Sequence, residues 1–248
     1  MAGFWARTRR FLIPDGFLSG LVFILAAAPI MAFGLFLIMR TTWGVGPWDV
    51  LHLGLAQRTG LTVGRAHQLT GLSLVILTLL LGGRTVTLIT LINTTLVGLW
   101  LDWYNARNVL PVIPGLTGLP VLAAGLLLMG FGIALYLHPG LGAGPRDGLM
   151  LTLSQRTGQP IARVKVAMDV TAMLAGLVLG GPAGLGTVAV ALGLGPSIQF
   201  FRQMLGAVDA RVRARRPKAA RASHAPLHGP AVNQQAAPPA AQQGRTIR

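Results

Sequence analysis

An internal repeat constrains the fold of this chain more than any other feature of its sequence. The segment 44–60, GVGPWDVLHLGLAQRTG, returns as segment 142–158, GAGPRDGLMLTLSQRTG, and eleven of the seventeen aligned positions are identical. A double glycine follows each copy at the same offset, at Gly82-Gly83 and at Gly180-Gly181. A repeat of this kind predicts two related halves, each organised around one copy of the motif.

Composition indicates that both halves lie in a membrane. Hydrophobic residues make up 52% of the chain and charged residues 11%, whereas a soluble domain carries about 25% charged residues. Several runs of about twenty residues contain almost no charge, and a spanning helix needs this length to cross a hydrocarbon core of about 30 Å. The sequence therefore predicts an all-α, polytopic membrane protein that has the lipid bilayer as a partner.

Six transmembrane helices are expected, three in each half, and the motif forms a short half-helix after the first span of each half. The predicted spans are 17–39, 63–81, 86–104, 119–137, 161–179 and 185–204. The first of them exceeds the 7–15 residues of a signal-peptide core, so we interpret it as a span and not as a cleaved leader. The predicted parts of the chain are an N-terminal segment 1–16, repeat 1 at 17–105, a connector 106–118, repeat 2 at 119–206 and a tail 207–248.

The basic residues predict the orientation. When both termini are cytoplasmic, most of the Arg residues near the spans fall on the cytoplasmic side, as the positive-inside rule requires. Three spans per half then give the halves opposite orientations, an inverted repeat of the kind found in many transporters. The tail 207–248 is basic and rich in Ala, Pro and Gln, so we expect it to be disordered and to contact anionic headgroups. The net charge of +15 is concentrated next to apolar helices, and this distribution argues against a nucleic-acid partner.

Each motif copy carries the start and stop signals of a short helix. Proline suits the first helical position, an Asp in the first turn meets the positive end of the helix dipole, an Arg in the last turn meets the negative end, and a left-handed glycine ends the helix. These residues are Pro47, Asp49, Arg58 and Gly60 in the first copy and Pro145, Asp147, Arg156 and Gly158 in the second. A helix of about eleven residues covers about half of the hydrocarbon thickness and therefore cannot span it.

Two interpretations of the motif stay open. In one, the Gly-x-Gly-Pro-x-Asp sequence is only a turn and a helix cap. In the other, the two half-helices bring their N-termini together near the membrane midplane and line a substrate or ion site. A lipid-facing Asp at mid-depth costs about 2.5–3.5 kcal/mol, so in both cases the two Asp residues should face protein, a cavity or the interface. The candidate binding residues of the motif are Gly46, Pro47 and Asp49 with Gly144, Pro145 and Asp147.

Three further charged residues are candidates for the same site. Arg65 and Arg163 match across the repeat, one turn into the span after each half-helix. They either snorkel to the interface or pair with a motif Asp. Asp169 lies well inside a predicted span and is a functional candidate, although a local pair with Lys165 explains it equally well.

Several kinds of chemistry are not expected. The chain has no Cys and no Glu, and its six acidic residues are all Asp. The absence of Cys excludes disulfides, thiolate metal sites and a Cys nucleophile. Neither His52 nor His67 lies in a recognisable metal-ligand spacing, so neither is interpreted as a metal site. We therefore expect neither an enzyme nor a bound cofactor or metal.

The motif and its surroundings resemble the YczE/YyaS/YitT group of bacterial membrane proteins. The resemblance rests on the Gly-x-Gly-Pro-x-Asp turn, the Gln-Arg-Thr-Gly end of the short helix, the double glycine, and a late pattern at Gly186-Thr187 and Gly195-Pro196. It covers residues 17–204, and the first half departs from the late pattern at Ile89-Thr90 and Gly98-Leu99. It implies a bacterial cytoplasmic-membrane protein of a family without an established biochemical activity, for which transport has been suspected. It supplies no catalytic residues.

Two functions stay open at this point. The first hypothesis is a small transporter or channel-like protein, with a central site for a small molecule or ion built from both motif copies. The second is a non-transporting membrane module, an accessory, scaffold or regulatory protein that uses its basic tail to engage lipid or a partner. The sequence leaves open the substrate, the partner proteins and whether the protein forms a homo-oligomer.

Overall fold

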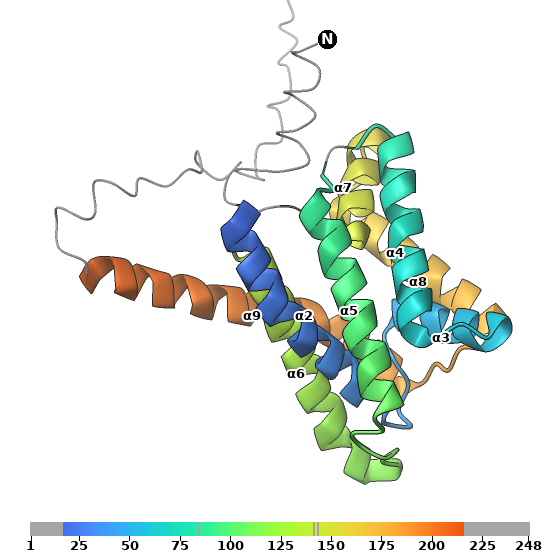
Figure 1. Cartoon of the computed structure of the whole chain (residues 1–248). Helices are drawn as coiled ribbons and strands as arrows, with labels where there is room; N and C mark the ends of the chain where they lie inside the picture. Colours follow the sequence, from blue (N-terminus) through green and yellow to red (C-terminus); the bar gives the residue numbers. More distant parts are fainter. Residues whose placement is uncertain (1–16, 84, 141, 143, 216–248) are drawn as a thin grey trace, which may run out of the picture. The chain divides into compact units, whose positions relative to one another are not determined.

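The structure is a computed structural model that describes residues 17–83, 85–140, 142 and 144–215 (Figure 1). The predicted N-terminal segment 1–16 and the tail from residue 216 onward lie outside the described residues. Contacts divide the chain into two units, Met1–Gly206 and Ala207–Arg248, and the first of them forms the helical body.

Regular structure in the described ranges is helical, which confirms the all-α fold class. The first half contains α2 (Phe17–Met39), α3 (Pro47–Thr59), α4 (Val63–Leu80) and α5 (Leu88–Ala106). The second half contains η1 (Gly115–Thr117), α6 (Gly118–Leu137), α7 (Pro145–Thr157), α8 (Ile161–Val178) and α9 (Leu185–Arg215). The half-helices α3 and α7 both have 13 residues, and α4 and α8 both have 18. Helices of equal length thus occur at two pairs of corresponding places in the chain.

Helix boundaries follow the local signals in the sequence. Pro47 and Pro145 occupy the first positions of α3 and α7, where the missing N–H is no loss. Gly60 and Gly158 end these helices in the left-handed conformation, with φ of 72° and 67°. The hydroxyl of Thr62 accepts a hydrogen bond of 3.3 Å from the backbone N–H three residues on, which caps α4. The predicted start and stop signals of both half-helices are confirmed.

Helices of the first half pack against helices of the second half in reciprocal pairs. Helices or residues at the same place in the two halves are called counterparts. α2 packs against α6, its own counterpart, and α3 packs against α8 while α7 packs against α4. A Cβ atom on Gly34 would lie 2.5 Å from the backbone nitrogen of Met129, and one on Gly132 would lie 2.9 Å from the backbone nitrogen of Met31. Gly34 and Gly132 are counterparts, and so are Met31 and Met129. The same contact is therefore made twice. Because the residue numbers run in opposite directions along the contact, α2 and α6 are antiparallel (Figure 1).

The buried core lies where α2, α5 and α6 meet. Small residues, among them Gly34 and Gly132, let the backbones of α2 and α6 approach closely, as is usual where helices pack in a membrane. Around them Phe36 is fully buried, and its ring centroid lies 5.8 Å from that of Tyr104 in α5. This core holds the first helices of both halves together and fixes where the two half-helices begin.

Three helical segments are long and apolar enough to cross a membrane, where six were expected. They are α2, α4 and the continuous segment Gly115–Leu137 that includes α6. The other three helices fall short for two reasons. Polar side chains lower the mean hydropathy of α5, which contains Asn93 and Asp102, and of α9, which contains Arg202. α8 is apolar on average but carries three charged residues, Arg163, Lys165 and Asp169. Composition alone therefore identifies half of the predicted spans within the described part of the chain.

Helix α9 is longer than expected. The sequence predicts an end near residue 204 and a disordered tail from residue 207, but the described helix continues to Arg215. The stretch 207–215, AVDARVRAR, is rich in Ala and Arg, which have high helix propensity. The structure is thus helical in the first part of the predicted disordered tail.

Candidate functional site

A cavity of about 230 Å³ lies between the two halves, and the starts of both half-helices line it. All of the longer helices, α2, α4, α5, α6, α8 and α9, also contribute to its wall. Seven of the nine predicted binding residues line this cavity, namely Gly46, Pro47, Asp49, Gly144, Pro145, Asp147 and Asp169. The structure therefore brings the two motif copies together around one space.

The cavity wall is built largely from counterpart positions. Where one half contributes a residue, the other half contributes the residue at the same place in the repeat. Such pairs are Met31 and Met129, Leu35 and Ile133, Asp49 and Asp147, His52 and Met150, His67 and Lys165, Thr70 and Met168, and Gly71 and Asp169. The chemistry within several pairs differs, so the cavity is symmetric in its backbone and asymmetric in its polar groups.

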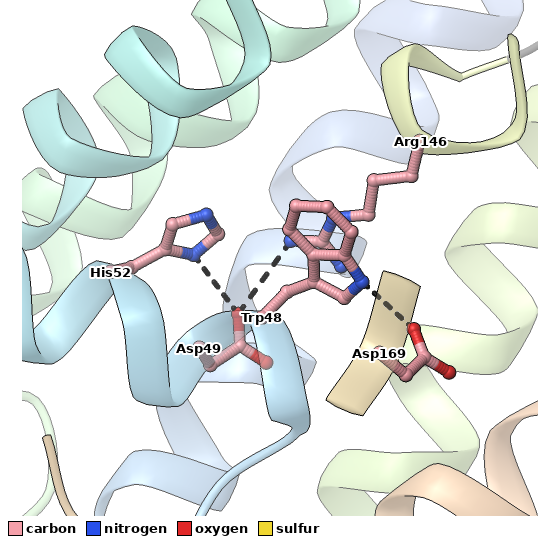
Figure 2. A network of polar contacts seen from close by, with 5 residues as sticks. All are labelled: Trp48, Asp49, His52, Arg146 and Asp169. Atoms are coloured by element: carbon pink, nitrogen blue, oxygen red, sulfur yellow. Dashed lines mark hydrogen bonds and ion pairs between the residues drawn. The ribbon is translucent and has the colours of Figure 1, made fainter. Parts of the chain in front are cut away.

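The carboxylate of Asp49 is buried between two nitrogen-bearing side chains (Figure 2). Asp49 is 3% exposed, and its Oδ1 lies 3.2 Å from Nδ1 of His52, which is 1% exposed. Nη2 of Arg146, from the other motif copy, lies 3.9 Å from the same oxygen. The protonated Nδ1 of His52 donates to the carboxylate in this geometry. The first motif Asp therefore faces a cation from the opposite half.

Asp169 joins α8 to the first half-helix. Nζ of Lys165 donates to its Oδ2 at 2.6 Å, which confirms the predicted local pair. Nε1 of Trp48 donates to its Oδ1 at 2.8 Å, a contact across the two halves (Figure 2). Asp169 is thus both locally paired and part of the cavity wall.

The two motif copies contact each other directly through Trp48 and Arg146. These residues occupy the same position in the two copies, and the guanidinium carbon of Arg146 lies 4.9 Å from the ring centroid of Trp48. A cation over the face of an aromatic ring contributes about 0.5–2 kcal/mol. The contact lies at the interface between the two halves and joins two residues at the same position of the repeat.

The carboxylate of Asp147 has a different environment from that of Asp49. The side chain is exposed, and it lines the cavity. Among the described residues, none makes a hydrogen bond or an ion pair within 4 Å with this carboxylate. The positions that correspond to the partners of Asp49 hold Met150 and Trp48, which carry no charge.

Two more polar groups in the cavity wall have a buried atom without a partner. Asn93 in α5 is 5% exposed, and its Oδ1 has no hydrogen-bond partner among the described residues. The same holds for Nδ1 of His67 in α4. The ring of His67 packs edge-on against that of His52, with 4.9 Å between centroids. Buried polar atoms are normally hydrogen-bonded, so these two groups are available to a ligand.

Arg65 and Arg163 lie outside the cavity wall. Arg65 is exposed at the edge of a separate surface groove that also contains Gln68. Arg163 is exposed, and its Nη1 donates to Oε1 of Gln159 at 3.3 Å. The structure does not bring either Arg to a motif Asp, and both positions suit side chains that reach the interface.

Sequence reasoning missed most of the polar groups that share the cavity with the predicted residues. No role is predicted from the sequence for Trp48 or for Arg146, which occupies the same position in the second copy. His52 and Lys165 were considered, but not as part of this site, and Asn93 was not considered. A signal was present, because three of these positions are places where the aligned halves differ in charge or polarity.

Comparisons with known proteins place the chain in a family. The profile of the family of unknown function DUF6198 matches residues 18–203. A membrane protein of Bacillus subtilis (strain 168) named YczE, described as uncharacterized, is 35% identical over 209 residues, which is 83% of this chain and 95% of YczE. An uncharacterized protein of Haemophilus influenzae is 35% identical over 205 residues, 81% of this chain and 90% of that protein.

A third relative, the uncharacterized protein YyaS of Bacillus subtilis (strain 168), is 29% identical over 161 residues, which is 64% of this chain and 80% of YyaS. No solved structure matches the chain. The predicted resemblance to YczE and YyaS is confirmed. The matched residues include both motif copies and the whole cavity wall, so the chain belongs to the DUF6198 family of membrane proteins, whose function is unknown.

Proposed function

We propose that this protein is a small transporter or channel-like protein of the bacterial cytoplasmic membrane, and that the cavity between its halves is the substrate site. One observation carries the proposal: a single cavity is lined by the charged starts of both half-helices, at counterpart positions of the repeat. Transporters built from inverted repeats bind their substrates at the repeat interface, next to the ends of discontinuous helices.

The packing of α2 on α6 supports opposite orientations of the two halves. These helices are counterparts, both are candidate spans, and they run antiparallel. If both cross the bilayer, repeat 1 and repeat 2 enter it in opposite senses. The distribution of basic residues favours cytoplasmic termini. The reciprocal pairs α3 with α8 and α7 with α4 extend the same relation to the half-helices.

The exposed faces of α8 and α9 support six spans. Val166, Val170 and Leu174 form an exposed apolar row on α8, and Leu185 and Leu192 are exposed on α9. Lipid tails would cover such faces, while the charged residues of α8 lie at the cavity or near the start of the helix. At about 1.5 Å per residue, the 18 residues of α8 cover about 27 Å, close to the hydrocarbon thickness.

The cavity sets the size of the substrate. An apolar cavity of about 150 Å³ is large enough to hold benzene, so a cavity of about 230 Å³ holds a molecule somewhat larger than benzene. The groups around it also favour a polar ligand, because charged side chains at membrane depth are costly unless they pair, face water or serve a substrate pathway.

Ligand-dependent stabilisation of the full-length protein in detergent tests the proposal. Thermal unfolding is measured across a panel of small metabolites for the wild type and for two Met-to-Trp variants. Met150→Trp fills the cavity, and the matched control Met204→Trp places the same side chain on an exposed position of α9 outside it. We expect at least one compound to stabilise the wild type and Met204→Trp but not Met150→Trp.

The flux of that compound into proteoliposomes then separates transport from binding. Flux that Met150→Trp abolishes and Met204→Trp preserves is the expected result. If no compound distinguishes the two variants, the proposal is contradicted, and the alternative of a non-transporting accessory, scaffold or regulatory protein is favoured.

A further inference from the structure

Among the described residues, the charged groups of the cavity leave one carboxylate without a partner. Three carboxylates line it, Asp49, Asp147 and Asp169, together with two permanent cations, Arg146 and Lys165. Lys165 is paired with Asp169 at 2.6 Å, and Arg146 lies 3.9 Å from Asp49. Histidine has an ordinary pKa of about 6.5, so with the histidines neutral the described residues of the wall carry one net negative charge. We assign the excess to Asp147, because the two cations contact the other two carboxylates.

Divergence within the repeat explains this asymmetry. His52 follows Asp49 by three residues and contacts it, but Met150 stands at the corresponding place after Asp147. Arg146 supplies the cation that faces Asp49, but Trp48 stands at the corresponding place in the first copy. The charge of Asp49 is therefore compensated by His52 and Arg146, whereas the carboxylate of Asp147 faces the cavity.

The rest of the wall suits a ligand that has an apolar part and hydrogen-bond donors. Asn93, which is 5% exposed, presents a side-chain oxygen that has no partner in the described part of the chain, and oxygen accepts hydrogen bonds. Four methionines are among the apolar residues of the remaining wall, and their flexible, polarisable side chains adapt to ligands of varied shape. These are Met31, Met129, Met150 and Met168.

We propose that the cavity binds small organic monocations, with an ammonium group at the carboxylate of Asp147 and the apolar part of the molecule against the methionine-lined wall. This inference rests on the proposed function, because it names the substrate class of the same site. The carboxylate and the unpartnered oxygen of Asn93 both accept hydrogen bonds, so they match the donors of an ammonium group.

An inorganic ion fits this wall less well than an organic cation. Among the described residues, no group of three His or Asp side chains is placed to hold a metal ion. The cavity is also larger than a dehydrated ion, and most of its wall is apolar. An anionic substrate would place its charge beside the uncompensated carboxylate, while both cations of the wall are already directed at other carboxylates.

The test uses four-carbon probes that differ only in the polar group. Thermal unfolding of the full-length protein in detergent is followed with n-butylammonium chloride, n-butanol and sodium butyrate, and with sodium and potassium chloride at equal ionic strength. We expect n-butylammonium alone to raise the melting temperature, by about 2–4 °C at several times its Kd.

Asp147→Asn should weaken n-butylammonium binding roughly tenfold or more, because it removes the paired charge and keeps the shape. The matched control Asp209→Asn, outside the cavity, should retain the wild-type affinity. Equal stabilisation by butanol or butyrate, or an unchanged affinity in Asp147→Asn, would overturn the inference. A shift with sodium or potassium alone that Asp147→Asn abolishes would replace the organic class by an inorganic ion.

The outcomes also separate this inference from the proposed function. If butyrate or butanol stabilises the protein and Met150→Trp abolishes the effect, the cavity is a binding site but the cationic class is wrong. If no probe stabilises the protein, and no compound of the metabolite panel distinguishes Met150→Trp from Met204→Trp, both proposals fail.

Discussion

The two motif copies have the same helix signals but different chemistry at the cavity. Each starts with a Pro, carries an Asp two residues later and ends at a left-handed glycine. Asp49 is buried against His52 and Arg146, whereas Asp147 is exposed to the cavity beside Met150. Residues that define a helix end are constrained by the backbone in both halves. Side chains that face a shared space are free to diverge, and there the chemistry of the site is decided.

The helices that follow the motif show the same difference. Gly71 in α4 corresponds to Asp169 in α8, and His67 corresponds to Lys165. α8 therefore carries an ion pair where α4 carries a glycine and a histidine. The ion pair brings the charged residues of α8 to three, against one in α4, and this difference explains why α4 is a candidate span and α8 is not, although they have the same length and place in the repeat.

Breaking the shared contact between α2 and α6 should have the largest effect. Gly34→Leu and Gly132→Leu each push a side chain into the backbone of the opposite helix, so each should lower the free energy of unfolding by about 3 kcal/mol or more. Thermal unfolding in detergent measures the loss. Gly206→Ala is the control, because a Cβ there meets nothing within 4 Å. Damage from one Leu variant and tolerance of the other would show that the contact is not shared by the halves.

Removing one carboxylate charge at a time should separate the two motif copies. Asp49→Asn leaves Arg146 beside a neutral amide and should lower the free energy of unfolding by about 1–3 kcal/mol, less than for a fully buried pair because the guanidinium still reaches the cavity. Asp147→Asn should change it by less than about 0.5 kcal/mol. Equal losses in the two variants, measured by thermal unfolding, would contradict the difference in their surroundings.

Giving Asp147 a histidine partner should make its surroundings more like those of Asp49. Met150→His places an imidazole three residues after Asp147, as His52 follows Asp49, and it should weaken n-butylammonium binding about three- to tenfold by competing for the carboxylate. Titration of the melting temperature gives the affinity. His52→Met, the reverse exchange in the first copy, leaves the surroundings of Asp147 intact and should keep the affinity. A larger loss in His52→Met than in Met150→His would place the ligand at Asp49.

The smallest effects are expected at the matched arginines. Arg65→Gln and Arg163→Gln remove exposed charges outside the cavity, so each should change the free energy of unfolding by less than about 0.5 kcal/mol. The n-butylammonium shift should be unchanged in both. A shift that either substitution abolishes would bring these residues back into the site.

The helices could be predicted from the sequence because their signals are local. The range of α2 agrees with the predicted 17–39, and both half-helices begin and end at the expected Pro and Gly. A proline at the first turn or a glycine with positive φ acts within a few residues, so periodicity and spacing are sufficient to find it. The end of α9 was misjudged because composition suggested disorder where helix propensity prevailed.

The composition of the site could be predicted only in part, because it depends on contacts between distant residues. Seven candidates line the cavity, since the repeat itself indicated the motif positions. The contact of Arg146 with Asp49 and that of Trp48 with Asp169 join residues about a hundred positions apart. Local spacing does not indicate which residues of one half contact which residues of the other. The packing of α3 on α8 and of α7 on α4 determines these contacts.

The most direct test of the central claim, that two inverted halves enclose one site, is cysteine labelling at matched ends of the half-helices. The chain contains no Cys, so single substitutions have no background. Thr59 and Thr157 end α3 and α7, and both are exposed. In intact cells, a membrane-impermeant maleimide should label Thr59→Cys, and it should label Thr157→Cys only after permeabilisation. Labelling of both variants from the same side of the membrane would contradict the inverted arrangement.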